Sequence, residues 1–192
     1  MGGSRTIGDA DGDIAALVYA GADRPDLVLC AFARRLTDAG RRVCGVVQLR
    51  DGSCGGSPGR VLVLDGWQVI DVGRKHRAAG DCRLDADWLD QMGRQVEASI
   101  RRGVDSVVVN RFGPLEAAGR GFRGAILAAS ETETPLIVAV PAFEFERWTR
   151  FSNGMTVRLD CDLDSALGWW RNVVRPKPPA AAVDLQARDR LK

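Results

Sequence analysis

The chain has 192 residues, 45% hydrophobic and 27% charged, so it is long enough to bury a core and lies within the usual size of one domain. Lys and Arg number 27 against 25 Asp and Glu, and a net charge of +2 gives no overall field for nucleic acid or an anionic membrane. No segment approaches the roughly 20 apolar residues of a membrane span, and the start lacks an apolar signal core. We therefore expect a cytoplasmic protein that binds neither nucleic acid nor membrane.

The first part of the chain predicts strands that alternate with a helix. A buried strand, "DIAALVYAG", precedes an amphipathic helix that begins near Pro25 and has Leu27, Cys30, Ala31 and Arg34 at helical spacing. A second strand, "RRVCGVVQ", follows, and "RVLVLDGWQVIDVG" then predicts a β-hairpin that turns at Asp65-Gly66.

The second part continues the alternation. A long helix is predicted from about Asp85 to Arg102, and the β-branched run "VDSVVVN" after it is typical of a central parallel strand. Further elements are expected in the order helix, strand, short helix, strand and helix, near residues 121–132, "PLIVAVP", "FEFERWTRF", "MTVRLD" and "DLDSALGWWRNVV".

This order predicts a three-layer α/β domain with a mostly parallel sheet and a β-hairpin insertion. The expected organisation is a flexible start at residues 1–13, one α/β domain at residues 14–175 and a Pro/Ala-rich tail at residues 176–192. In such sheets ligands bind where strands end and helices begin, near a switch in strand order. The corners after the first strand and after "SVVVN" are therefore the candidate sites, and they would lie together if the two strands are neighbours.

The corner after the first strand, "GADRPDLV", lacks a phosphate-binding loop. It has Gly21 but no second glycine, no lysine and no hydroxyl residue to hold magnesium. Asp23 and Asp26 would oppose an anion at the helix start, and we favour an ordinary turn in which Asp23 caps the helix. Arg24 is the cation that this corner offers.

The corner after "SVVVN" carries an unusual concentration of arginine and glycine. Asn110 stands where a Walker-B strand would end in Asp, so magnesium would lose a charged anchor. Glu116 is the nearby acid and the candidate catalytic base, although a pair with Arg120 one helical turn away is the simpler role. The residues that could surround a tetrahedral anion are Asn110, Arg111, Gly113, Gly119, Arg120, Gly121 and Arg123. The alternative is a solvated helix face whose arginines pair with Glu116 and contact solvent.

The five cysteines are odd in number and have no C-x-x-C spacing, so we expect thiols and neither a disulfide framework nor a zinc site. Cys82 and Arg83 precede the long helix and are accessory candidates, because a thiol at a helix start tends toward thiolate. Cys54 could approach Cys82 to form a two-thiol site, and Cys30 and Cys44 lie in apolar patterns typical of a core.

Trp169 and Trp170 are adjacent and cannot both face one core. One of them could cover a contact between subunits, so a homodimer is favoured over a monomer.

On the segments "RRVCGVVQ", "AAGDCRLD" and "VVVNRFGPLEAAGRGFR" the sequence resembles an uncharacterised bacterial family, domain of unknown function 2478, from about Ile14 to Trp170. The resemblance implies a fold like that of phosphate-loop nucleoside triphosphatases and a link to molybdate handling. Members carry a Lys after the strand-end Asn, where this chain has Arg111. The missing phosphate-loop lysine is not restored by the resemblance.

These observations predict a protein that binds a small oxyanion, such as molybdate, or the phosphate of a nucleotide. ATP or GTP hydrolysis is not expected, because phosphoryl transfer needs a phosphate-loop lysine and well-held magnesium. The alternatives are a nucleoside triphosphatase with a non-standard phosphate site, using Arg24 or Arg111 and Glu116, and a non-catalytic protein-interaction module.

Overall fold

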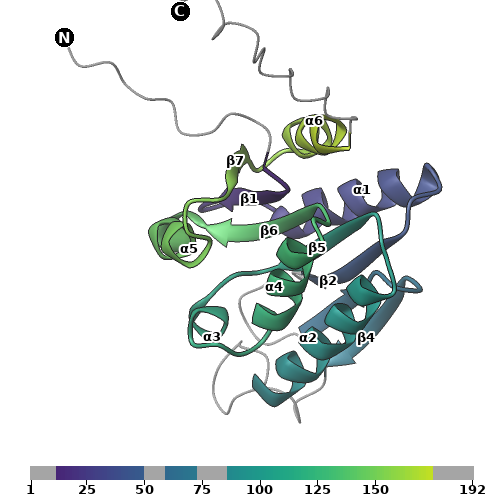
Figure 1. Cartoon of the computed structure of the whole chain (residues 1–192), viewed down its shortest axis with the longest axis horizontal. Coiled ribbons are helices and arrows are strands. Elements are labelled where there is room, and N and C mark those ends of the chain that lie inside the picture. Colours follow the sequence, from purple (N-terminus) through teal and green to yellow (C-terminus); the bar gives the residue numbers. More distant parts are fainter. Residues whose placement is uncertain (1–11, 50–58, 73–85, 175–192) are drawn as a thin grey trace, which may run out of the picture.

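The computed structural model describes residues 12–49, 59–72 and 86–174, which form one seven-stranded sheet with helices on both faces (Figure 1). The strands are β1 (Ile14–Tyr19), β2 (Val43–Leu49), β3 (Gly59–Val63), β4 (Gln68–Val72), β5 (Ser106–Asn110), β6 (Leu136–Pro141) and β7 (Val157–Asp160). The helices are α1 (Pro25–Asp38), α2 (Ala86–Arg101), α3 (Pro114–Ala117), α4 (Arg123–Glu131), α5 (Phe145–Phe151), α6 (Leu163–Val173) and the 3₁₀ turn η2 (Ala142–Glu144). The predicted three-layer α/β fold is confirmed.

The strand order is β4-β3-β2-β5-β6-β1-β7, and the five strands from β2 to β7 in this order are parallel. The predicted hairpin is β3 and β4, which pair antiparallel with each other and lie at one edge of the sheet beyond β2. Their turn includes Asp65 and Gly66, and Gly66 has a φ of 89°, a conformation that glycine adopts without strain.

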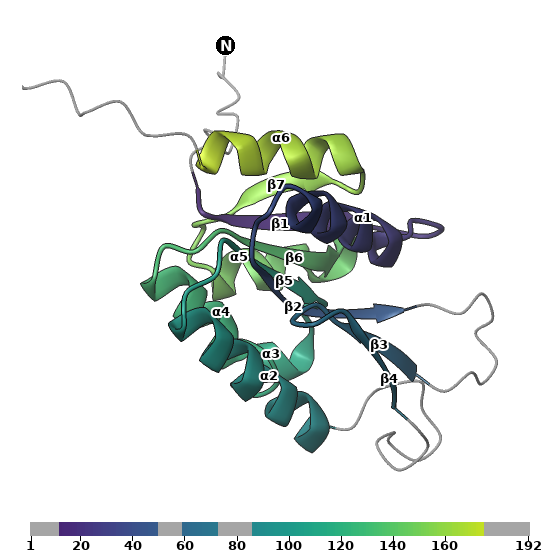
Figure 2. The ribbon, with the colours of Figure 1, turned by 90° about the vertical axis from the view of Figure 1, so that its right-hand side faces the viewer.

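Each face of the sheet is covered by its own helices (Figure 2). Helices α2, α4 and α5 pack on one face around Trp148, Phe112 and Phe122, whereas α1 and α6 pack on the other around Phe32 and Trp169. The central strands are buried on both faces, so their apolar residues run without interruption.

Two details of the packing could not be settled from the sequence. The face of α1 that packs on the sheet carries Leu29, Phe32, Ala33 and Leu36, and Leu27 is 56% exposed. The helical spacing noted in the sequence predicted the helix correctly, and the structure shows that its Phe32 face is the buried one. The corners after β1 and β5 would lie together only if these strands were neighbours, and this condition is not met because β6 lies between them.

Of the two adjacent tryptophans, Trp169 lies in the core and Trp170 lies at its periphery. Trp169 is buried, and its indole N–H donates to the Gly12 carbonyl at 2.9 Å. Trp170 is half-buried beneath the guanidinium of Arg41, which lies 5.7 Å from the ring centroid. The expected homodimer stays a prediction.

Candidate functional site

The five parallel strands end at the same edge of the sheet, and two of their corners hold the predicted site residues. We call residues 20–26 the β1 corner and residues 110–123 the β5 corner. The strand-to-helix connections change direction at β1, because α1 leads from β1 to β2 on one side and α5 leads from β6 to β7 on the other. This is the switch in strand order at which α/β sheets bind ligands.

The β1 corner satisfies its own polar groups. The Ala20 amide donates to the Asp23 carboxylate at 2.9 Å, and Asp23 N donates back to the Ala20 carbonyl at 3.1 Å. The helix starts at Pro25, which has no N–H, and its N-cap is Arg24 without a side-chain capping bond. The predicted capping of α1 by Asp23 is therefore wrong, because Asp23 closes the turn before the helix.

A carboxylate lies at the α1 start where a phosphate loop would hold an anion. Asp26 is 1% exposed, and Arg24 donates to both of its oxygens at 3.0 and 2.7 Å. This two-bond fork commits the Arg24 guanidinium to an internal anion. Arg24, proposed from sequence as an accessory anion ligand, is thus already engaged by the chain itself.

Glu116 is a structural group of the β5 corner. It is 4% exposed, and its two oxygens accept from the Gly113 amide at 2.9 Å and the Phe122 amide at 3.4 Å. Burial raises the pKa of this carboxyl, while the main-chain N–H groups and the charge of Arg111 oppose the shift. With both oxygens occupied, Glu116 links Gly113, the N-cap of α3, to Phe122, the N-cap of α4.

The expected ion pair between Glu116 and Arg120 is not formed. Arg120 instead contacts α2, donating to Asp90 at 2.6 and 3.0 Å and to Asp87 at 2.6 Å. The Gly121 amide also donates to Asp90, at 2.5 Å, and this bond is the main reason that the pKa of Asp90 is lowered, followed by Arg120. The Arg120 side chain therefore connects the β5 corner to α2 through its bonds to Asp87 and Asp90. The sequence did not predict this contact, because Asp87 and Asp90 lie 33 and 30 residues from Arg120 in the chain.

Gly93 and Gly121 allow the β5 corner to pack closely against α2. A Cβ at Gly93 of α2 would overlap the Gly121 carbonyl oxygen, and a Cβ at Gly121 would overlap Glu116. Gly121 has a φ of 60° and Gly119 a φ of 90°, which other residues adopt only with strain. Both glycines were predicted to admit a ligand, but the contacts of Gly121 are with the protein itself.

Arg111 and Arg123 are the remaining cations of the corner. Within the described residues neither side chain forms an ion pair, and Arg111 is exposed. The Arg123 guanidinium lies over the Phe151 ring, 5.2 Å from its centroid. Stacking uses the face of a guanidinium and leaves its N–H edge available for an anion.

The other predicted residues have mixed outcomes. Asn110 donates from its side chain to the Gln48 carbonyl at 3.3 Å and so links β5 to β2, and its peptide bond to Arg111 is cis. Gly113 is the N-cap of α3, and its amide is taken by Glu116. Cys82, Arg83 and Cys54 lie outside the described residues.

The described cysteines and acids do not form a metal site. Within residues 12–49, 59–72 and 86–174, no three His, Cys, Asp or Glu residues are grouped to hold a metal ion. Cys44 is buried as predicted, and Cys30 is half-buried on α1. Burial raises the pKa of Cys161 to about 11, and nearby Asp23 adds to the shift. In the same ranges, no helix is long and apolar enough to cross a membrane.

Comparison with known proteins places the chain. Residues 14–169 match the family of proteins of unknown function DUF2478. The chain belongs to this family. It is also 34% identical over 162 residues to the molybdenum import ATP-binding protein ModC 2 of Bradyrhizobium diazoefficiens, a match that covers 83% of this chain and 18% of that relative. No solved structure matches the chain.

The family and this relative agree with the resemblance seen in the sequence. The mostly parallel, helix-flanked sheet is that of a phosphate-loop NTPase-like fold, although the β1 corner has no phosphate loop. Because the chain spans about a fifth of the relative's length, the match concerns one part of that protein.

Proposed function

We propose that the protein binds a small anion at the β5 corner, either an oxyanion such as molybdate or the phosphate of a nucleotide. The observation that carries the proposal is the division of the arginines. Arg24 and Arg120 are engaged by carboxylates, whereas Arg111 and Arg123 form no ion pair with any described residue and lie on the edge where such folds bind ligands.

The binding group is a pair of guanidinium edges. Arg111 projects from the end of β5, and Arg123 opens α4. Guanidinium groups form charge-assisted, two-bond contacts with tetrahedral anions, and such contacts are about twice as strong as neutral hydrogen bonds. The buried Glu116 carboxylate stays behind its two amide donors, so its charge is partly satisfied before an anion arrives.

Molybdate is the first anion to test, because a relative is named a molybdenum import ATP-binding protein. The same name makes a nucleotide phosphate the second. Hydrolysis is not part of the proposal. The β1 corner offers an internal Asp26–Arg24 pair in place of a phosphate-loop lysine, and the strand end offers Asn110 in place of a carboxylate.

Isothermal titration with molybdate, tungstate, sulfate, phosphate and ATP tests this proposal. We expect at least one of these anions to bind, with an affinity that falls about tenfold in Arg111→Gln and in Arg123→Gln, since each removes a charged hydrogen-bond donor. Arg35→Gln is the matched control, an exposed arginine on α1 away from the corner.

Three outcomes would overturn the proposal. These are no binding of any of the five anions, equal binding by the two corner variants and the wild type, or an equal loss in Arg35→Gln. The first would favour the interaction-module alternative. A malachite-green assay with ATP and GTP tests the absence of hydrolysis, and turnover that disappears in Glu116→Gln would reinstate the triphosphatase alternative.

A further inference from the structure

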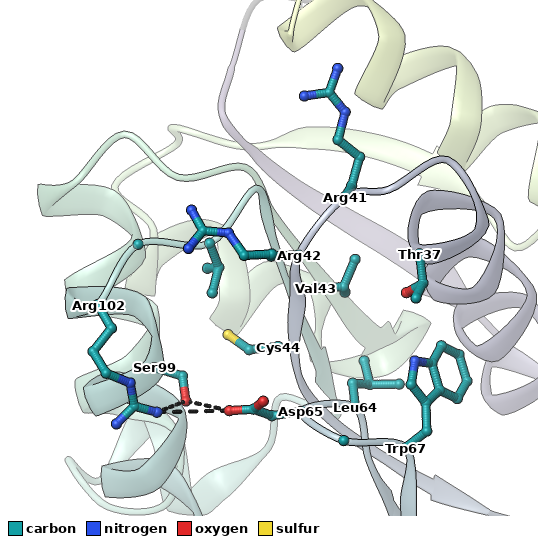
Figure 3. Close-up of a pocket in the computed structure, with 13 residues that line it drawn as sticks. Thr37, Arg41, Arg42, Val43, Cys44, Leu64, Asp65, Trp67, Ser99 and Arg102 are labelled. Carbon is teal, nitrogen blue, oxygen red and sulfur yellow. Dashed lines mark hydrogen bonds and ion pairs between the residues drawn. The ribbon is translucent and has the colours of Figure 1, made fainter.

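A cavity lies at the amino edge of the sheet, opposite the β5 corner, and nothing in the proposed function uses it (Figure 3). Its volume is about 490 Å³, within the range of small-molecule sites. It is bounded by the end of α1, the start of β2, the turn between β3 and β4, and the end of α2.

The edge of β2 is open at this cavity. The Arg42 carbonyl points toward β5, where it accepts from Asp105 N at 2.8 Å. Strand residues alternate in direction, so the main-chain groups of Val43 point to the other side. On that side β3 pairs only from Val46 onward, so no described strand faces Val43. The cavity thus offers a main-chain donor and acceptor.

Arg42 supplies a cation at the rim. Its side chain is exposed and forms no ion pair with any described residue, and its guanidinium lies 3.6 Å from the place of a Cβ on Gly103. Arg41 points away from the cavity in Figure 3 and lies 3.6 Å from Asp105. Arg102 is bound to Ser99 at 2.9 Å and lies 3.8 Å from Asp65. Arg42 is therefore the cation left for a ligand.

The rest of the lining combines polar side chains, Thr37, Asp65 and Ser99, with an apolar part. Val43, Cys44 and Leu64 are buried, and Trp67 lies beside Leu64 under the end of α1. The guanidinium of Arg34 lies 5.1 Å from the Trp67 ring centroid and helps to hold the indole in place. Burial and the charge of Asp65 raise the pKa of Cys44 to about 12. This thiol is therefore neutral and serves as part of the cavity wall.

We propose that this cavity binds a small organic anion with a flat apolar body, such as an aromatic carboxylate. In Figure 3 Arg42 and Trp67 lie on opposite sides of β2, so the acid group lies on the Arg42 guanidinium and the flat body extends past the open edge at Val43 to Leu64 and Trp67. An apolar lining with a few convergent polar groups is the common composition of small-molecule sites. The proposal does not depend on anion binding at the β5 corner.

Nuclear magnetic resonance on the ¹⁵N-labelled full chain tests it with three probes. Indole-3-carboxylate carries both features, indole-3-carboxamide keeps the flat body without the charge, and inorganic phosphate keeps the charge without the body. We expect indole-3-carboxylate to shift the Trp67 indole N–H and the Ser99 and Gly103 amides saturably. The other two probes should bind at least about tenfold more weakly, because each lacks one half of the recognition.

Arg42→Gln should weaken indole-3-carboxylate about tenfold and leave the rest of the spectrum unchanged, which shows that the variant is folded. Arg150→Gln, an exposed arginine on α5, should bind as the wild type does. The proposal is overturned if the carboxamide or phosphate shifts Trp67 and Gly103 at equal concentration, if the indole-3-carboxylate shifts miss these two residues, or if Arg42→Gln binds unchanged. Loss of the β5-corner response in Arg111→Gln would leave this test unaffected, so the two proposals fail separately.

Discussion

The β1 and β5 corners lie on the same edge of one sheet, yet they handle charge in opposite ways. In the β1 corner the Arg24 guanidinium donates to the buried Asp26 carboxylate of the same chain. In the β5 corner the buried carboxylate, Glu116, is satisfied by main-chain N–H groups, and the cation Arg111 stays exposed. In this NTPase-like sheet the arginine without an ion pair to the described residues therefore lies after β5, two strands away from the corner where a phosphate loop would stand.

The two corners also differ in how they are held. The β1 corner closes on itself through the bonds between Ala20 and Asp23. The β5 corner is fastened to α2 by Arg120 and by the Gly121 amide. Changes in α2 should therefore disturb the β5 corner and leave the β1 corner intact.

The largest effect is expected from Gly93→Ala, since the new methyl group would overlap the Gly121 carbonyl oxygen and push α2 from the corner. Overpacking of this kind costs about 1–3 kcal/mol, and we expect the upper end because the neighbour is main chain. Gly168→Ala in α6 is the control, because nothing lies within 4 Å of its Cβ. It should stabilise the helix slightly. Urea unfolding measures both, and equal stability of the two variants would contradict the close packing of α2 on the β5 corner.

A smaller loss is expected from Glu116→Gln. The amide keeps one acceptor but turns an N–H toward a main-chain N–H, so one buried donor loses its partner at a cost of about 2 kcal/mol. Glu146→Gln, an exposed residue on α5, should cost almost nothing. Thermal unfolding separates the two variants. If Glu116→Gln is as stable as Glu146→Gln, the structural role of Glu116 is wrong.

The smallest effect is expected from Asp90→Asn, and it depends on pH. The pKa of Asp90 is lowered in the folded protein by the Gly121 amide and then by Arg120. A lowered carboxyl pKa contributes stability above the ordinary pKa of Asp, and this contribution is lost as the pH falls through the lowered value. The variant should therefore be slightly less stable than the wild type at neutral pH, with the difference disappearing in acid. Unfolding midpoints from pH 7 down to pH 3 provide the check, and a difference that grows in acid would reverse the assigned sign.

Much of the fold could be predicted because its signals are local. The unbroken apolar run of β5 indicated a buried parallel strand, and Asp65-Gly66 indicated the hairpin. The partners of Arg120 could not be predicted in the same way. A helix-spaced Glu116 was the nearest acid in sequence, but α2 brings Asp87 and Asp90 across the corner. The amino-edge cavity was missed because it is formed by three stretches far apart in the chain, residues 37–44, 64–67 and 99–104.

The most direct test of the central claim is to map molybdate or phosphate on the ¹⁵N-labelled protein, residue by residue. Anion binding at the β5 corner predicts saturable shifts in amides of residues 110–123, which need about tenfold more anion in Arg111→Gln, while residues 20–26 stay still. Arg24→Gln should leave these shifts in place, although it removes the guanidinium that donates to the Asp26 carboxylate. Shifts confined to residues 20–26, abolished by Arg24→Gln and retained in Arg111→Gln, would contradict the account.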